Sequence, residues 1–309
     1  MSIDPNEVCI LIPTLNEEAT IAEVVDGFTS QGFDDILVID GGSTDDTQEI
    51  AEKHDAWVVE QEGSGKGQAV QQAFEIIEKP YVVMIDGDGT YLPEEVDRLL
   101  EPLAEGYDQV IGNRLGNDDA FDRLNYIGNK IFNYGFRKAH GRDLDDILTG
   151  YRAFRLDAVK RLNLEETGFG IETEMSVESL KHDQEMVSVS ITYLSRPEDS
   201  STNLHPVKDG ARIGYTIYRM TKTNNPFFYF GSVGSILAGI GVITGIYVIY
   251  DWHFHEVTHQ LLAILTALSI LAGIQLFIFA SLSDVVVTLH RDRMQEMRYL
   301  ESKFEEEDE

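Results

Sequence analysis

Residues 81–95 read YVVMIDGDGTYLPEE, and this stretch decides the fold. A short apolar run from Tyr81 to Ile85 predicts a buried strand, and it ends at two aspartates, Asp86 and Asp88. Because Asp and Gly both favour tight turns, a turn explains them. A divalent cation is the alternative, since its charge relieves repulsion between two close carboxylates. This segment alone leaves both interpretations open.

The same pattern recurs along residues 1–205, where short apolar runs alternate with helix-like segments. The runs are 8–13, 35–40, 56–60, 81–86 and 108–113. This alternation predicts an α/β fold with a mostly parallel sheet and helices on both faces. In such sheets ligands bind at the carboxyl ends of the strands. Four polar clusters fall there, namely Asn16-Glu17, Asp40, Asp86/Asp88 and Asn113-Arg114.

The composition is that of an acidic globular protein. Of 309 residues, 43% are hydrophobic, and the formal net charge is −30. A chain this acidic repels nucleic acid, so we expect no nucleic-acid partner. Salt at molar concentration screens such self-repulsion, which favours a salt-loving cytoplasm over an ordinary acidic protein. The single cysteine, Cys9, lies in an apolar run and predicts a buried thiol, and the acidic N-terminus lacks the basic start of a signal peptide.

Two uncharged segments near the C-terminus, 227–250 and 260–283, are each long enough to span a bilayer. A buried hairpin in a soluble core is the alternative, and two runs of this length disfavour it. Basic residues flank the pair on both outer sides, whereas the link between the spans has none. Both termini are therefore expected in the cytoplasm. These basic residues are Lys208, Arg212, Arg219, Lys222, Arg291, Arg293, Arg298 and Lys303.

The chain is therefore expected to consist of four parts. They are a cytoplasmic catalytic domain (1–205), an amphipathic juxtamembrane segment (206–226), a two-helix transmembrane hairpin (227–283) and a cytoplasmic acidic tail (284–309).

Two polar motifs near the N-terminal strands admit a functional and a structural explanation. Gly63, Gly65 and Gly67 surround Lys66 at a helix start, where backbone N–H groups attract phosphate. The Walker pattern is absent, so this signal is weak alone. Capping explains the Ser and Thr after Asp40, while Asp40 itself fits a contact to a base or ribose.

Three further motifs have simple alternatives. HEVTH (255–259) matches a zinc-protease pattern, but a short link between two spans leaves little protein to build such a site. His253 adds a third potential ligand in the same link. Glu172 and Glu174 suit an exposed helix start, where acids are favoured. Arg152 and Arg155 suit pairing with surface acids.

Taken in order, the motifs resemble glycosyltransferase family 2, and within it the dolichyl-phosphate sugar transferases. The segments are IPTLNEE, VIDGGSTDDT, GKGQA, DGDGTY, IGNR, LTGYRAFR, GFGIETE and YLSRPEDSS, within residues 8–204. The acidic composition and the two spans add a likeness to haloarchaeal members that start N-glycan assembly. The resemblance implies a GT-A (Rossmann-like) fold, a nucleotide-sugar donor, Mg²⁺ or Mn²⁺, and inversion at the sugar.

The resemblance also implies roles for individual residues. Asp86 and Asp88 match the acidic motif that holds metal and donor. Pro13, Asn16, Glu17 and Asp40 match nucleoside contacts, and Lys66 matches a donor contact. Arg114, Thr149 and Arg196 match positions near the acceptor phosphate. Thr90 stands where mannose-transferring relatives usually have Gln, so the resemblance supplies no residue for that metal ligand. Thr202 replaces a usual Lys, so one expected contact to the acceptor is also missing.

An anionic acceptor sets the expected chemistry. Polyprenyl phosphate attacks the sugar without a general base, and a metal on the two aspartates neutralises the departing diphosphate. The expected sugar is glucose from UDP. Three rivals remain: a processive polysaccharide synthase, whose QxxRW motif is absent here, a sugar nucleotidyltransferase, and a non-catalytic membrane scaffold.

Overall fold

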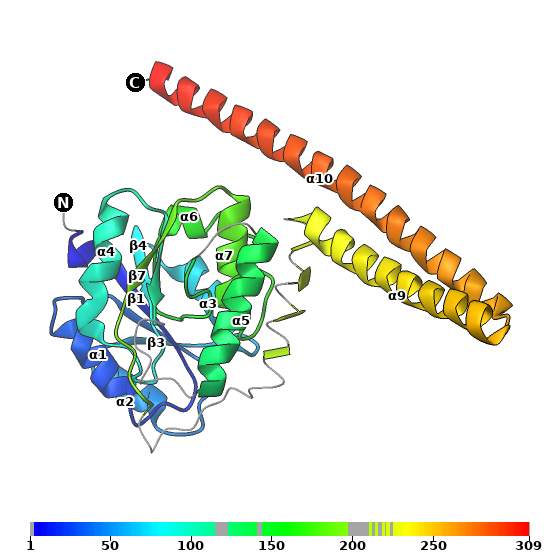
Figure 1. Cartoon of the computed structure of the whole chain (residues 1–309). Helices are drawn as coiled ribbons and strands as arrows, with labels where there is room; N and C mark the ends of the chain where they lie inside the picture. Colours follow the sequence, from blue (N-terminus) through cyan, green and yellow to red (C-terminus); the bar gives the residue numbers. More distant parts are fainter. Residues whose placement is uncertain are drawn as a thin grey trace. The chain divides into compact units, whose positions relative to one another are not determined.

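The computed structural model describes residues 3–114, 123–140, 144–196, 210–211, 214–215, 218–219, 221–222 and 225–308. The chain divides into two compact units, Met1–Ile217 and Tyr218–Glu309. Figure 1 shows a sheet with helices in the first unit and a pair of long helices in the second. Thr202, Lys208 and Arg212 lie outside the described residues, as does much of the juxtamembrane segment.

The first unit is built on a seven-stranded sheet in the order β3-β2-β1-β4-β6-β5-β7. All neighbours pair in parallel except β6, which is antiparallel to both β4 and β5. The mostly parallel sheet that the alternation predicts is therefore confirmed. The strands are β1 (Val8–Thr14), β2 (Ile36–Asp40), β3 (Trp57–Glu60), β4 (Tyr81–Met84), β5 (Gln109–Asn113), β6 (Arg152–Arg155) and β7 (Met186–Ser190).

Helices cover both faces of this sheet because alternate strand residues face opposite sides. On one face Ile10, Val38 and Val83 pack with apolar residues of α1, α2 and α4. On the other, Leu11 and Met84 pack with α3, α6 and α7. The helices are α1 (Ile21–Thr29), α2 (Thr47–Lys53), α3 (Lys66–Ile76), α4 (Val96–Ala104), α5 (Arg123–His140), α6 (Leu156–Val159) and α7 (Ile171–Lys181), with short 3₁₀ turns at Pro5–Glu7 and Pro93–Glu95.

The strand pairing brings the predicted polar clusters to one edge. Thr14 at the end of β1 pairs with Asp40 at the end of β2, and β4 runs parallel to β1. Since β6 is antiparallel to both of its neighbours, β5 runs in the same direction as β4. The segments that follow β1, β2, β4 and β5 therefore all leave the same edge of the sheet, as expected for a ligand site.

Cys9 is buried between the sheet and its helices, as its apolar setting predicts. Burial raises the pKa of its thiol far above the ordinary value. A thiol of this kind is unreactive near neutral pH, because the thiolate is the nucleophilic form.

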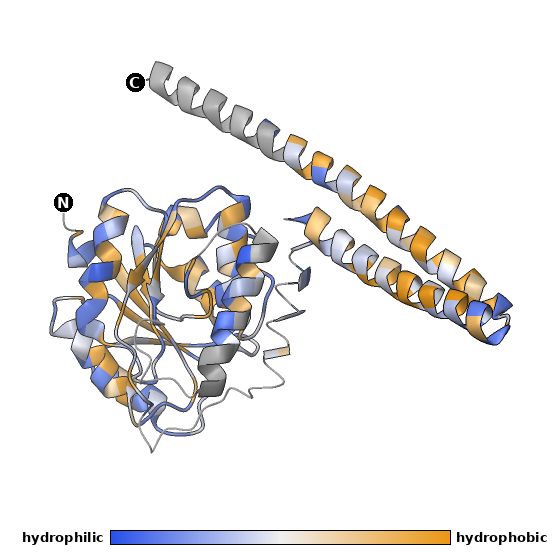
Figure 2. Cartoon of the chain, viewed as in Figure 1, coloured by the Kyte–Doolittle hydropathy of each residue, from blue (hydrophilic) through white to orange (hydrophobic). Residues whose placement is uncertain are grey.

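The second unit consists of α9 (Pro226–His255) and α10 (Gln260–Asp308). Two segments, Pro226–His255 and Gln260–Leu289, are long and apolar enough to cross a membrane, and only 11% and 6% of their most apolar windows are buried. Core helices of a soluble protein are mostly buried, so this exposure disfavours the soluble hairpin. Figure 2 shows hydrophobic residues along both helices. Beyond Leu289, α10 continues as one helix through the acidic tail.

Small residues allow the two long helices to pack closely. A Cβ added at Gly234 would lie 2.9 Å from the Gly273 carbonyl oxygen, and one at Gly241 would lie 2.6 Å from an Ile270 side-chain carbon. Helix interfaces in membranes favour such positions, because small residues let backbones approach.

Candidate active site

Asp86 and Asp88 lie just beyond β4 at the carboxyl edge of the sheet. Asp88 is buried, whereas Asp86 retains some exposure. Burial raises the pKa of Asp86, Lys66 opposes that shift, and the charges of Asp88 and Glu172 add to it. The repulsion between the paired carboxylates that the sequence suggested is therefore present in the folded site.

Lys66 neutralises one side of this pair. Its Nζ lies 2.5 Å from Asp86 Oδ1 and 2.6 Å from Glu172 Oε1, and its side chain is 14% exposed. Burial disfavours the ammonium, but the two carboxylates outweigh burial and raise the pKa of Lys66 above its ordinary value. Lys66 therefore carries a permanent positive charge near neutral pH and bridges α3, the end of β4 and α7.

Packing explains two of the glycines around Lys66, Gly65 and Gly67. A Cβ at Gly67 would lie 2.0 Å from the Glu166 carbonyl oxygen, and one at Gly65 would lie 2.3 Å from that of Thr167. Gly67 N–H donates to Thr167 O at 3.2 Å. The loop before α7 therefore lies against the start of α3, and this contact fixes the backbone that carries Lys66.

Asp88 is held from two sides. Thr90 donates to Asp88 Oδ1 from its hydroxyl at 2.6 Å and from its backbone N–H at 3.0 Å. Arg196 donates from Nη2 to Asp88 Oδ2 at 2.5 Å, and the same nitrogen lies 3.5 Å from Glu17 Oε1. Thr90, at the position where the resemblance leads one to expect Gln, thus orients the aspartate carboxylate.

The predicted nucleoside contacts gather where β1 and β2 end. Pro13 is buried within β1, opposite Ile39. Asn16 has a positive φ of 55° and accepts the Thr44 N–H at 2.8 Å. Asp40 is fully buried and accepts hydrogen bonds from Gly42, Ser43 and Gln48. These bonds give Asp40 a structural role in the turn that the sequence did not reveal.

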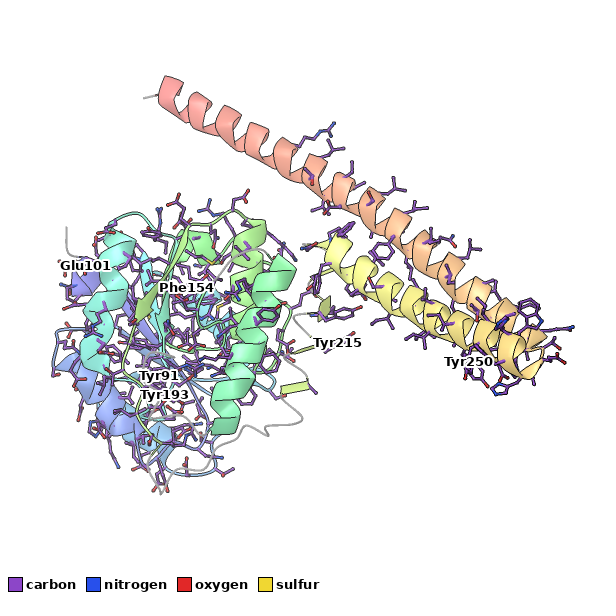
Figure 3. The ribbon with its side chains drawn as sticks, viewed as in Figure 1. Tyr91, Glu101, Phe154, Tyr193, Tyr215 and Tyr250 are labelled. Atoms are coloured by element: carbon purple, nitrogen blue, oxygen red, sulfur yellow. The ribbon has the colours of Figure 1, made fainter. Side chains whose placement is uncertain are left out.

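Arg114 is buried rather than placed on an exposed rim. Its Nε and Nη2 form a two-pronged pair with Asp146, at 2.7 and 2.9 Å, and its Nη1 lies 3.4 Å from Tyr91 Oη. Its guanidinium also lies 5.3 Å from the centre of the Tyr193 ring, which in turn lies 5.3 Å from the Tyr91 ring (Figure 3). Arg114 therefore forms a buried ion pair with Asp146, and its guanidinium is not open to solvent.

Thr149 and the turn that follows it lie behind Asp86. Thr149 is fully buried, with its hydroxyl 3.4 Å from Tyr91 Oη. A Cβ at Gly150 would lie 2.4 Å from Asp86 Oδ2, so the backbone at Gly150 forms a wall against that carboxylate. Gly150 N–H donates to Tyr91 Oη at 3.1 Å. Thr149 thus adjoins the site without presenting its hydroxyl to solvent.

The structure corrects two expectations about charged residues. Arg152 is fully buried, and it donates to Thr149 O, Ile147 O and Ser176 Oγ instead of pairing with surface acids. Burial lowers the pKa of Arg152 to about 10. Glu172 and Glu174 are only 4% and 2% exposed, so they do not form an exposed helix start. Arg155 does pair with an exposed acid, Asp157.

The HEVTH segment does not form the zinc-protease arrangement. His255 is the last residue of α9 and His259 precedes α10, so the two histidines do not share one helix. Both instead contact Asp251, at 2.7 and 2.6 Å. Among the described residues, no group of three or more His, Cys, Asp and Glu side chains has a metal-binding arrangement.

Two aspartates nevertheless fit a divalent cation that takes its remaining ligands from a substrate. Mg²⁺ is usually held by one or two carboxylates together with substrate phosphates. Four carboxylates and two cationic side chains meet around Asp86 and Asp88, which leaves a formal charge of minus two for a divalent ion to balance. The six are Glu17, Lys66, Asp86, Asp88, Glu172 and Arg196.

Glu172, Asp146 and Tyr91 were not recognised in the sequence as site residues. Glu172 stands in GFGIETEM, where one turn of acidic and polar residues resembles any helix start. Asp146 is one of several acids in DLDDILTG, and nothing in the sequence marks it as the partner of Arg114. Only the proximity created by folding identifies them.

Comparisons with known proteins agree with this geometry. A family model described as glycosyl transferase family 2 matches residues 9–162. Glycosyltransferase AglJ of Haloferax volcanii is 48% identical over 300 residues, which are 96% of this chain and 99% of that protein. A dolichyl-phosphate hexose transferase of the same organism is 32% identical over 219 residues, 70% of this chain and 94% of the relative.

A similar solved structure is glucosyl-3-phosphoglycerate synthase from Mycobacterium tuberculosis with Mn²⁺, UDP-glucose and phosphoglyceric acid. The likeness has a TM-score of 0.58 and 25% identity, and covers 69% of this chain and 79% of the other.

Proposed function

Because this chain belongs to glycosyltransferase family 2, we propose that it transfers a hexose from a nucleotide sugar to dolichyl phosphate. Its sheet and helices have the GT-A fold, in agreement with the structural likeness. The observation that carries the proposal is the pairing of Asp86 and Asp88 with Lys66 and Arg196 at the carboxyl edge. A nucleoside diphosphate needs such a combination of carboxylates for a metal and cations for phosphates.

The acceptor supplies its own nucleophile. A phosphate oxygen of dolichyl phosphate attacks carbon 1 of the sugar from the face opposite the diphosphate. The bond between carbon 1 and the diphosphate oxygen breaks, and the nucleoside diphosphate departs with the electron pair. One attack from the opposite face inverts the anomeric centre. No general base is required, because the phosphate monoester is already anionic near neutral pH.

The chain's residues divide between donor and acceptor in this proposal. Asp86 and Asp88 hold the donor end of the site, and Lys66 provides positive charge beside Asp86. Pro13, Asn16, Glu17 and Asp40 bind or shape the nucleoside side, where β1 and β2 end.

Arg196 is the acceptor-phosphate ligand, because its side chain is 25% exposed and its guanidinium reaches Asp88. Thr149 and Arg114 support the acceptor side from beneath, since both are buried.

A divalent metal, Mg²⁺ or Mn²⁺, would be held by Asp86 and Asp88, and it would stabilise negative charge on the departing diphosphate. Mn²⁺ is present with UDP-glucose in the similar synthase structure. The UDP-glucose in that structure supports the same donor here, and the similarity to a dolichyl-phosphate hexose transferase supports the acceptor. On this basis the reaction is the first step of lipid-linked N-glycan assembly.

The two apolar helices support a lipid acceptor, because a bilayer that they crossed would also hold the lipid. They are long enough to cross a bilayer, and the proposal places both termini and the catalytic unit in the cytoplasm. Basic residues flank the spans on the outer sides only, in agreement with that orientation.

The direct test is mass spectrometry of lipid products. Membranes containing the protein are mixed with polyprenyl phosphate and, one at a time, UDP-glucose, UDP-galactose, GDP-mannose and UDP-N-acetylglucosamine. We expect a lipid phosphate carrying one hexose, formed with a UDP-hexose and lost with Asp88→Asn. Transfer to a polysaccharide would favour a synthase on the same fold. A protein that binds no nucleotide sugar with Mn²⁺ in a calorimetric titration would be a scaffold instead.

A further inference from the structure

Glu172 lies in the core of the site although nothing in its motif assigns it a role. It is 4% exposed, and its Oε1 lies 2.6 Å from Lys66 Nζ. The same ammonium lies 2.5 Å from Asp86 Oδ1. Lys66 is therefore held between two carboxylates that come from different elements, the end of β4 and the first turn of α7.

Two independent contacts fix the relative positions of α3 and α7 at this point. Gly65 and Gly67 pack against the backbone of the loop that precedes α7, with no room for a Cβ. The Gln71 side chain also donates to Glu166 O at 2.9 Å. Because the backbones are locked together, Glu172 and Lys66 meet in one arrangement and the ammonium has little freedom to move.

The position of the Lys66 ammonium matters because Asp86 is confined on two sides. Lys66 contacts its Oδ1, and the backbone at Gly150 packs against its Oδ2. Gly150 stands so close that a Cβ there would lie 2.4 Å from Asp86 Oδ2. Without the Glu172 carboxylate, the Lys66 ammonium would be free to turn away from Asp86 toward another carboxylate or a phosphate. A long lysine side chain loses its orientation readily, because it has many rotamers.

From these contacts we propose that Glu172 is a positioning residue that holds the Lys66 ammonium against Asp86 and so fixes the donor end of the site. Glu172 affects donor binding through Lys66 and does not itself contact either substrate. The consequence for catalysis rests on the proposed function, whereas the coupling between the two side chains does not.

A double-mutant cycle tests this, because it separates an effect through Lys66 from an independent one. The variants are Glu172→Gln, Lys66→Met and the double variant, made in the full-length chain. Glu178→Gln is the matched control, since Glu178 lies in the same helix, is 4% exposed and pairs with Lys181 at 2.5 Å. The readouts are calorimetric binding of UDP with Mn²⁺, and kcat and KM for each substrate.

We expect Glu172→Gln to weaken binding of UDP with Mn²⁺, and to lower kcat/KM for the donor, by about tenfold, which is roughly 1.4 kcal/mol. The KM for polyprenyl phosphate should change by less than about twofold, within the error of additivity. In the Lys66→Met background, Glu172→Gln should weaken binding of UDP with Mn²⁺ by less than about twofold. Glu178→Gln should behave like the wild type in binding.

Equal losses from Glu172→Gln in both backgrounds, or no loss in the wild-type background, would overturn the proposal. A wild-type protein that binds UDP with Mn²⁺ but transfers nothing to polyprenyl phosphate would refute the acceptor assignment, and the binding cycle would still decide the role of Glu172. A wild-type protein that binds neither UDP nor GDP with Mn²⁺ would overturn the proposed function and, with it, the role of Glu172 at the donor end of the site. Unfolding midpoints of all variants exclude a general loss of structure as the cause.

Discussion

Arg196 donates a hydrogen bond of 2.5 Å to Asp88, the residue on which a catalytic metal would depend. The same guanidinium nitrogen lies 3.5 Å from Glu17 Oε1. Arg196 therefore holds positive charge where a divalent cation would also be attracted. Because Arg196 reaches both carboxylates through Nη2, a phosphate that binds Arg196 would lie close to Asp88, so the acceptor site and the metal site would share this side chain.

Removing the Arg196 guanidinium should strengthen metal binding and weaken acceptor binding. In Arg196→Gln, Mn²⁺ in the presence of UDP should bind more tightly, because Asp88 no longer has a competing cation. We expect a gain of at least about fivefold in affinity, or about 1 kcal/mol, because this pair, with side chains 25% and 11% exposed, is more buried than the surface pairs that contribute up to that value. The KM for polyprenyl phosphate should rise by at least about tenfold, and Arg196→Lys should not restore it, since an ammonium lacks the planar fork. Calorimetry and radiolabel transfer measure the two effects.

The control for this experiment is Arg161→Gln, because Arg161 belongs to an exposed ion pair with Asp157. Weaker binding of UDP with Mn²⁺ in Arg196→Gln, together with an unchanged KM for the lipid, would assign Arg196 to the donor site.

Asp88→Asn should abolish most of the transfer while leaving the fold intact. The substitution keeps the shape of the side chain but removes the charge that a metal needs. We expect kcat to fall at least about a hundredfold, or roughly 2.7 kcal/mol in barrier height. The Thr90 bonds to the side-chain oxygen can persist, so the unfolding midpoint should change little. Full activity in excess EDTA would contradict a role for a metal.

Arg114 and Asp146 should behave as a buried pair whose partners depend on each other. Arg114→Met alone leaves the Asp146 carboxylate buried without its cation, and such a loss costs about 3–5 kcal/mol. Arg114→Met combined with Asp146→Leu should recover much of that stability, because two apolar side chains replace both charges. Thermal unfolding in detergent compares the three variants. An Arg114→Met variant as stable as the wild type, but with a raised KM for the lipid, would instead indicate that Arg114 contacts the acceptor phosphate directly.

Gly150→Ala should reduce activity through Asp86. The added Cβ would lie 2.4 Å from Asp86 Oδ2, so the carboxylate or the turn must move. A displacement of reacting groups by about 1 Å can cost roughly a hundredfold in rate. Gly128→Ala is the matched control, because a Cβ there meets nothing within 4 Å. Turnover by Gly150→Ala equal to that of the control would show that Asp86 tolerates the shift.

Salt should stabilise this protein if the net charge of −30 is an adaptation to salt. Raising KCl from about 0.1 M to about 2 M shortens the screening length from about 10 Å to below about 3 Å. The thermal midpoint should rise over that range, because repulsion among surface carboxylates is screened. A flat or falling midpoint would refute the salt-loving interpretation.

The sequence determined the layered architecture and the place of the site. Apolar runs that end in polar residues, such as the one leading to Asp86, predict parallel strands whose carboxyl ends meet at one edge. The structure has that arrangement, with Thr14 beside Asp40 and β4 parallel to β1. Two long uncharged segments likewise predicted two apolar helices. These features follow from local periodicity, which a sequence displays directly.

The partners of the charged residues were decided only by the tertiary structure. In the sequence Arg114 only matches a position near the acceptor phosphate, but folding places it against Asp146, 32 residues away. Glu172 looks like a helix start, but folding brings it to Lys66, more than a hundred residues earlier in the chain. Whether a charge is exposed or buried depends on which distant segments pack around it, and residue periodicity carries no record of that. The sequence therefore located the site, and packing assigned its ion pairs.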